Sequence, residues 1–396
     1  VDAAPPTSAA RSSTSTRHPP TARRAAAVSP LGPAPTTTAK GFTVPMVARL
    51  LPMNAKQIGW ALHWVVRMVA FGLLMPYALF KLGLMQMGKP DFPELLITLG
   101  EKSPMGLLWT FMGFSPVVQF LAGLAEFVAA LLLLWRRTAW LGGLIGFIDL
   151  AVVWLLNMTF DVPVKIPSAF QALLYLLVLA PWLPRLFRFL AGRATEAVEA
   201  PQVITNEKVH RVTRFFPAVA AVVALGAGGF VMVNGIPRAL DREGTELSGV
   251  YSVAGGNIEP APELADDRRW SEIAFGSFDG FEAGNFYRVE GETPEGDFHG
   301  LAALRRASGD LHEGFYTLNG DRVTIQLTAP MTDDGVNAAP RGPIEETLEF
   351  TWRAEGDGLE LSPIDGTTDA FELTPSKLGT TLLDRPFTWV SPPFNR

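Results

Sequence analysis

Four ionisable residues lie inside stretches of sequence that are otherwise long and apolar. Glu126 lies near the middle of the run from Ser115 to Trp135, and Asp149 lies near the middle of the next run. His63 and Arg67 are four residues apart on an earlier apolar stretch, so a helix would place them on one face. A charged side chain at the centre of a bilayer costs about 2.5–3.5 kcal/mol on insertion scales, unless it is paired or protonated. We therefore expect these four residues to form a ligand-binding site inside the membrane.

The chemistry of this predicted site has three interpretations. Arg67 with one carboxylate would make a neutral pair, which leaves the second carboxyl protonated or hydrogen bonded. A protonatable carboxyl near His63 is what the reduction of a quinone needs, and it is also what proton or ion movement needs. The same groups would also suit a polar clamp that only holds helices together. The residues alone leave all three interpretations open.

A second group of charges lies near the expected outer ends of the spans, and it consists of Lys81, Asp161 and Lys165. These residues could form a rim that receives an anionic headgroup. Alternatively, Lys81 extends to the membrane interface, and Asp161 pairs locally with Lys165.

Five apolar stretches are long enough to cross a bilayer. Their approximate limits are 60–86, 115–135, 138–158, 168–190 and 215–236. We expect the first four to form a helical bundle within residues 44–192, with the fifth span added to it. The segment 92–114 includes a piece that is too short to span but rich in aromatic residues, which predicts an interfacial or re-entrant helix, or a short helix packed on the bundle.

The charges of the loops predict how the spans are oriented. Residues 1–43 read as a disordered basic tail, and 193–214, with four Lys and Arg, as a cytoplasmic linker. The loop between the second and third spans also contains two arginines, whereas the other loops have few cations. The positive-inside rule then makes the N-terminus cytoplasmic, and five crossings place residues 237–396 outside. We expect a multi-pass protein of a bacterial inner (plasma) membrane, with the bilayer as its first partner and a periplasmic or extracellular C-terminal domain.

The C-terminal part has the pattern of an all-β domain. From about Leu247 the apolar residues alternate, as strands require, and Asn319-Gly320 is a strong signal for a tight hairpin turn. About eight or nine short strands predict one antiparallel barrel or sandwich. The triplet Gly249-Val250-Tyr251 resembles the start of a lipocalin-type barrel.

Composition excludes several classes of function. Residues 237–396 carry 13 Lys and Arg against 29 Asp and Glu, which argues against binding to nucleic acid. The chain has no cysteine, so it cannot form a disulfide or bind an iron–sulfur cluster through thiolates. Of its five histidines only His63 lies in a predicted span, and His299 and His312 are too isolated to predict a metal site.

Three blocks of the membrane part carry a family resemblance. They are SPMGLLWTFMGFSP (103–116), AGLAEFVAALLLLWRRT (122–138) and NMTFDVPVKIPS (157–168). These blocks resemble the DoxX-like family of integral membrane proteins, in particular the branch with a C-terminal soluble β-rich domain. The resemblance implies a core of four membrane helices, to which some members add further helices. It also implies a link to redox chemistry, because some relatives are subunits of a thiosulfate:quinone oxidoreductase and others associate with oxidative-stress enzymes.

Three functions follow as hypotheses. In the first, the protein is a quinone-interacting or redox-associated membrane subunit, and its electrons come from a partner protein or directly from a substrate. In the second, it binds a lipid or other amphiphile and passes it between the bundle and the outer β-domain. In the third, it is a membrane scaffold whose outer domain docks a partner.

Overall fold

The structure is a computed structural model of the 396-residue chain. It describes residues 54–196, 206–240, 244–256, 258–279, 295–330, 343–366 and 368–377, together with 198, 201, 203 and 204. The predicted basic tail 1–43 lies outside the described residues.

Five helical segments are long and apolar enough to cross a membrane, so the chain is a multi-pass membrane protein. They are α1 (Ala55–Leu82), α3 (Pro116–Leu133), α4 (Ala139–Thr159), α5 (Lys165–Leu179) with its continuation through η3 (Ala180–Trp182) and α6 (Leu183–Leu190), and α8 (Phe216–Leu240), which follows the short helix α7 (Glu207–Thr213). The first helix starts and stops earlier than the predicted span 60–86. Asn54 caps its N-terminus through a capping box with Gln57, and the chain leaves the helix at Gly83.

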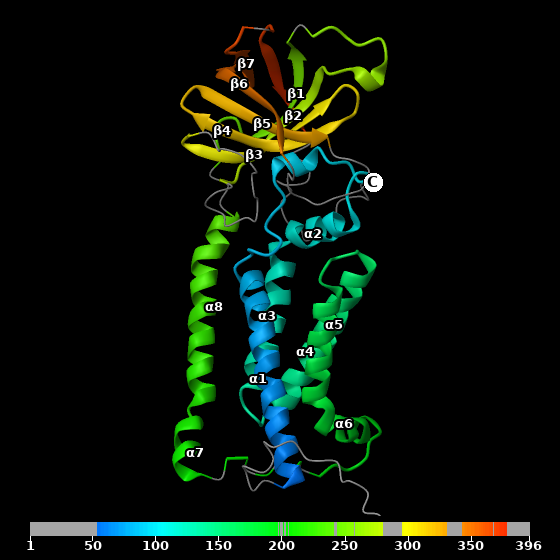
Figure 1. The fold of residues 1–396 in the computed structure, drawn as a ribbon, viewed down its shortest axis with the longest axis vertical. Helices are drawn as coiled ribbons and strands as arrows, with labels where there is room; N and C mark the ends of the chain where they lie inside the picture. The colour runs from blue at the N-terminus through cyan, green and yellow to red at the C-terminus, as the bar shows by residue number, and fades with distance from the viewer. Residues whose placement is uncertain are drawn as a thin grey trace, which may run out of the picture. The chain divides into compact units, whose positions relative to one another are not determined.

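Helices α1, α3, α4 and α5 pack against one another, and α8 lies alongside α1 (Figure 1). The shared core is apolar and includes Leu74, Ala78, Leu133 and Val178, each at most 1% exposed. The outward faces also carry large apolar side chains, which suits helices surrounded by lipid. Polar groups in the interior of this bundle therefore stand out against an apolar background.

The C-terminal domain is a closed antiparallel barrel of eight strands (Figure 1). The strands are β1 (Gly249–Gly255), β2 (Trp270–Phe275), β3 (Phe298–Arg306), β4 (Leu311–Asn319), β5 (Arg322–Pro330), β6 (Ile344–Glu355), β7 (Gly358–Pro363) and β8 (Phe371–Pro375). Each strand pairs with the next one along the chain, and β8 pairs with β1, for example Thr374 with Ser252. The β4–β5 turn consists of Gly320, at a φ of 58°, and Asp321. It lies one residue later than the predicted Asn319-Gly320, because Asn319 still pairs with Arg322 as the last residue of β4. The β-rich domain is thus a barrel and not a sandwich.

Aromatic and aliphatic side chains pack together inside the barrel. Phe275 and Tyr316 are fully buried, and their rings meet edge to face at 5.1 Å. Trp270 stacks on Phe371 with 4.5 Å between the ring centroids. These aromatic residues join one apolar core with Leu304 and other residues from all eight strands. The residues around Phe275 and Tyr316 therefore form a packed core, and a pocket of about 1250 Å³ lies beside it, lined in part by Trp270, Phe350 and Phe371.

The segment between α1 and α3 divides into two parts. The first contains the short helix η2 (Phe92–Leu95) and binds the barrel. Leu96 and Ile97 pack against Ala274 and other barrel residues, and the carboxylate of Asp91 accepts hydrogen bonds from the backbone and hydroxyl of Ser277 at 2.9–3.0 Å.

The second part is α2 (Pro104–Phe114), which is too short to cross a bilayer. Leu107, Phe111 and Phe114 remain exposed on it, at 40%, 64% and 47%. Such an apolar surface on a short helix agrees with an interfacial location.

Candidate intramembrane site

His63 and Arg67 lie at the end of the bundle where residues 134–138 connect α3 to α4. The Nε of Arg67 donates a hydrogen bond of 2.8 Å to the carbonyl of Leu133, the last residue of α3, and a second guanidinium nitrogen donates to the same oxygen. The Nε2 of His63 lies 2.9 Å from the carbonyl oxygen of Val178, in the last turn of α5. The last carbonyls of a helix lack partners within it, and positive charge is favoured there. Both residues therefore cap helix ends, and the prediction that Arg67 pairs with a carboxylate is wrong.

The partner of Glu126 is Lys81. The Nζ of Lys81 forms an ion pair with one carboxylate oxygen of Glu126, and the two side chains are only 6% and 2% exposed. Lys81 lies in the last turn of α1, and side chains on a helix lean toward its N-terminus, so the ammonium points into the bundle. Gly123 permits the close approach, because a Cβ atom there would lie 2.6 Å from the Cβ of Lys81. Lys81 thus belongs to the interior of the bundle and not to the predicted outer rim.

Asp149 on α4 and Tyr175 on α5 complete this group. Both lie near enough to Glu126 to interact with it electrostatically, and Asp149 also interacts with Lys81. Tyr175 is fully buried, and its ring fills space that Gly146 leaves free, since a Cβ atom at Gly146 would lie 2.2 Å from the ring. We call Lys81, Glu126, Asp149 and Tyr175 the central cluster.

The central cluster contains polar atoms without partners. Within the described part of the chain, no hydrogen bond reaches the second carboxylate oxygen of Glu126, one carboxylate oxygen of Asp149 or the hydroxyl of Tyr175. Leaving a buried polar group unpaired costs about 1–3 kcal/mol, so such groups call for a specific explanation. With one cation and two carboxyl groups, the cluster becomes neutral when one carboxyl holds a proton. The arrangement can therefore bind a polar group of a ligand, or exchange a proton.

The four predicted residues are thus divided between two places. Arg67 and Lys81 are 14 residues apart on α1, which corresponds to about 21 Å along the helix. Glu126 and Asp149 stay together, whereas His63 and Arg67 cap helix ends elsewhere.

The spacing of the buried residues along α1 indicates the inward position of Lys81. The buried residues of α1 follow a spacing of three and four, and they include Arg67, Ala70, Leu74, Ala78 and Lys81. Lys81 therefore lies on the same inward face as Arg67. The position of Lys81 at the end of an apolar run concealed this, because a lysine there usually reaches the interface.

Asp161 and Lys165 form an ion pair with each other, four residues apart and with 75% and 35% of their side chains exposed. Their contact is local, as in the alternative interpretation. An exposed pair of this kind contributes little to stability. No described contact joins this pair to Lys81, which is turned toward Glu126.

Comparison with known proteins identifies a relative of the chain. No protein-family model and no solved structure matches the chain. The chain is 30% identical over 136 residues to the uncharacterized protein YwoB of Bacillus subtilis (strain 168), and the match covers 34% of this chain and 86% of YwoB. The chain belongs to the family of YwoB. The similarity to YwoB says nothing about activity, and the DoxX-like resemblance stays a prediction.

Proposed function

We propose that the protein is a membrane subunit of a redox system that binds a quinone at the central cluster. The observation that carries this proposal is the set of unpartnered polar atoms on Glu126, Asp149 and Tyr175, buried at the middle of a membrane bundle. The DoxX-like resemblance supports it, because some members of that family act with quinones.

The chemistry of the cluster suits a quinone head group. The carbonyl oxygens of a quinone accept hydrogen bonds, which the hydroxyl of Tyr175 and the ammonium of Lys81 can donate. Reduction to the quinol takes up two electrons and two protons, and the carboxyls of Glu126 and Asp149 can hold protons. We assign the electron donor to a partner protein or a substrate, because the chain has no cysteine for an iron–sulfur cluster.

The alternatives receive less support from the geometry. Transfer of an amphiphile through the barrel needs an apolar passage, but Phe275, Tyr316 and their neighbours pack together inside it. The pocket beside Trp270 and Phe371 is lined largely by polar and charged residues, among them Asp267, Arg306 and Glu346. A scaffold needs no more than the neutral pair of Lys81 and Glu126. That role would leave the unpaired groups of Asp149 and Tyr175 without a purpose.

Mass spectrometry of lipophilic molecules that co-purify in mild detergent tests the proposal. We expect a quinone with the wild-type protein, and its loss in Asp149→Asn and in Tyr175→Phe, both of which leave the Lys81–Glu126 pair intact. Asp161→Asn is the matched control, because it makes the same change at an exposed carboxylate. Quinone retained in both cluster variants, or only bulk lipid in the wild type, would reject the proposal and favour the scaffold.

A further inference from the structure

Among the described residues, buried polar side chains follow one another from the central cluster without an apolar gap toward the end of the bundle where residues 160–164 connect α4 to α5. They are Asn157 on α4, and Ser168 and Gln171 on α5, with exposed fractions of 5%, 4% and 7%. A fourth buried polar side chain of the bundle, that of Gln119 on α3, is already occupied, because it binds the backbone of Met87 and Gly88.

The helix register aligns these side chains with the cluster. Ser168, Gln171 and Tyr175 follow one another at spacings of three and four on α5, so they share a face. Gln171 lies about 6 Å and Ser168 about 10 Å along the helix from Tyr175. On the neighbouring helix α4, Asn157 lies two turns beyond Asp149, about 12 Å away along the axis.

Two of these side chains have unsatisfied atoms. The amide nitrogen of Asn157 and the amide oxygen of Gln171 have no partner within the described part of the chain. The hydroxyl of Ser168 donates to the carbonyl of Lys165, which leaves its oxygen free to accept. Donors and acceptors in this arrangement can hold a file of water molecules, and such a file conducts protons.

On the opposite side, an apolar layer separates the cluster from Arg67 and from His63, whose buried Nδ1 also has no partner within the described part of the chain. Between Glu126 and Leu133, about 10 Å along α3, the buried residues that the structure describes are apolar. The same is true of α1 between Arg67 and Lys81, and of α5 from Tyr175 to Leu179. Arg67 lies beyond this layer, where it is bound to the carbonyl of Leu133. Water and protons therefore meet an apolar barrier on this side.

We propose that protons reach the central cluster from the 160–164 end only, along Asn157, Ser168 and Gln171. The inference rests on the proposed function in one respect, because it treats the cluster as a site of proton exchange. Each quinone reduced there would take two electrons from the donor and two protons from the compartment at the 160–164 end. In the reverse direction, oxidation of a quinol would return two electrons to the partner protein or substrate and release two protons to the same compartment.

Infrared spectroscopy of the protein in sealed vesicles tests this route. After a jump in the external pH alone, the C=O stretch of protonated carboxyls is followed and assigned with Glu126→Gln and Asp149→Asn. A protease added outside measures the fraction of molecules whose barrel is outside. The barrel follows α8, whose Gly235 packs on Gly83 at the end of α1, so the barrel marks the same end of the bundle as the 160–164 connection. We expect the fast phase to account for this fraction of the total carboxyl signal.

The variants Asn157→Leu and Gln171→Leu should slow the signal about tenfold or more, whereas Asn234→Leu, at an exposed position on α8, should not. If Gln171→Leu does not fold, Gln171→Met replaces it. A signal that follows the protease-protected fraction, or rates unchanged in both variants, would overturn the route while leaving quinone binding possible. A wild-type protein that binds quinone but gives no carboxyl signal would also overturn the route. A wild-type protein with neither bound quinone nor a carboxyl signal would reject the proposed function itself.

Discussion

Lys81 and Glu126 form the most consequential single contact of the bundle. Each alone would be an uncompensated charge in an apolar interior, and together they are neutral. The contact exists because Gly123 gives Lys81 room to lie against α3. A larger residue at that position would displace the lysine and leave Glu126 unpaired.

Removing one partner of this pair should therefore be costly. We expect Lys81→Met to lower the free energy of unfolding by about 3–5 kcal/mol, because Glu126 would remain as a buried charge without a partner. The double variant Lys81→Met/Glu126→Leu should recover most of this loss, since it removes both charges. Unfolding in mixed micelles measures the effect, with Lys165→Met as a control at an exposed ion pair. Equal stability of Lys81→Met and Lys165→Met would contradict the buried pairing.

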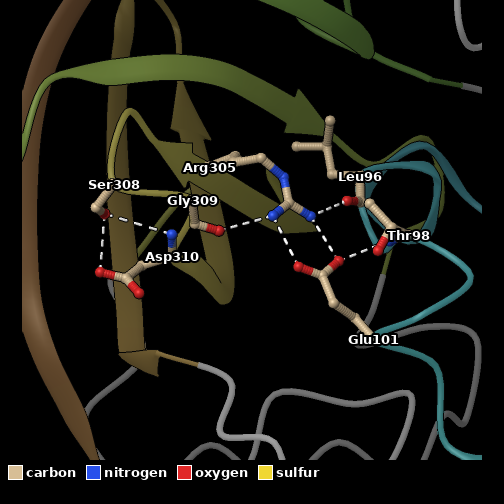
Figure 2. A network of polar contacts seen from close by, with 7 residues as sticks. All are labelled: Leu96, Thr98, Glu101, Arg305, Ser308, Gly309 and Asp310. Atoms are coloured by element: carbon tan, nitrogen blue, oxygen red, sulfur yellow. Dashed lines mark hydrogen bonds and ion pairs between the residues drawn. The ribbon is translucent and has the colours of Figure 1, made fainter. Parts of the chain in front are cut away.

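At the scale of elements, the segment 91–101 is held on the barrel by charged groups (Figure 2). The guanidinium of Arg305 on β3 donates to both carboxylate oxygens of Glu101, at 2.8 and 2.7 Å, and to the carbonyls of Leu96 and Gly309. The hydrogen bonds from Arg305 lower the pKa of Glu101 to about 2. Glu101 is consequently ionised and bound to Arg305 throughout the neutral range.

Two other carboxyls of this contact behave in the opposite way. Burial raises the pKa of Glu94 on η2 to about 7, and the neighbouring Asp91 adds to the shift while Lys102 opposes it. Burial also raises the pKa of Glu313 on β4 to about 7, with a further contribution from Glu94 and an opposing one from Lys102. The two elements thus meet at a pair of carboxyls that resist ionisation.

This pair predicts a pH dependence of stability. An acid whose pKa is higher in the folded state stabilises the fold when it is protonated, and that stabilisation is lost as the pH rises through the folded pKa. We expect the melting temperature of the barrel to fall between about pH 5 and 8, a window in which Glu101 stays ionised. Glu94→Gln should flatten this dependence, because the neutral amide also relieves Glu313. Calorimetry in detergent measures the effect, and Glu263→Gln serves as a control at an exposed position. A slope that persists in Glu94→Gln would show that other groups cause it.

At the scale of the whole molecule, the predicted orientation follows from the charges of the connections. The natural absence of cysteine allows a clean test, because any introduced thiol is unique. We expect Asp357→Cys, in the β6–β7 turn, to react with a membrane-impermeant maleimide on intact cells. Arg137→Cys, in the α3–α4 connection, should react only after the membrane is opened. The reverse pattern would invert the orientation, and labelling of both sites would contradict an odd number of crossings between them.

Much of the architecture is local in origin, and the sequence by itself was enough to predict it. Apolar runs of sufficient length predict the spanning helices, and alternation with Asn319-Gly320 predicts the strands and one of their turns. Glu126 and Asp149 were recognisable as buried ionisable groups, because their apolar neighbours in the chain determine their depth in the membrane.

Only the tertiary structure decided which groups meet. The closure of the barrel depends on the pairing of β1 with β8, and the docking of Asp91 on Ser277 joins residues 186 positions apart. The choice of Lys81 over Arg67 as the partner of Glu126 depends on how α1 is rotated against α3, and on the space at Gly123. Hydropathy and turn signals act over a few residues, whereas these contacts depend on the relative register of distant elements, which no short stretch of sequence contains.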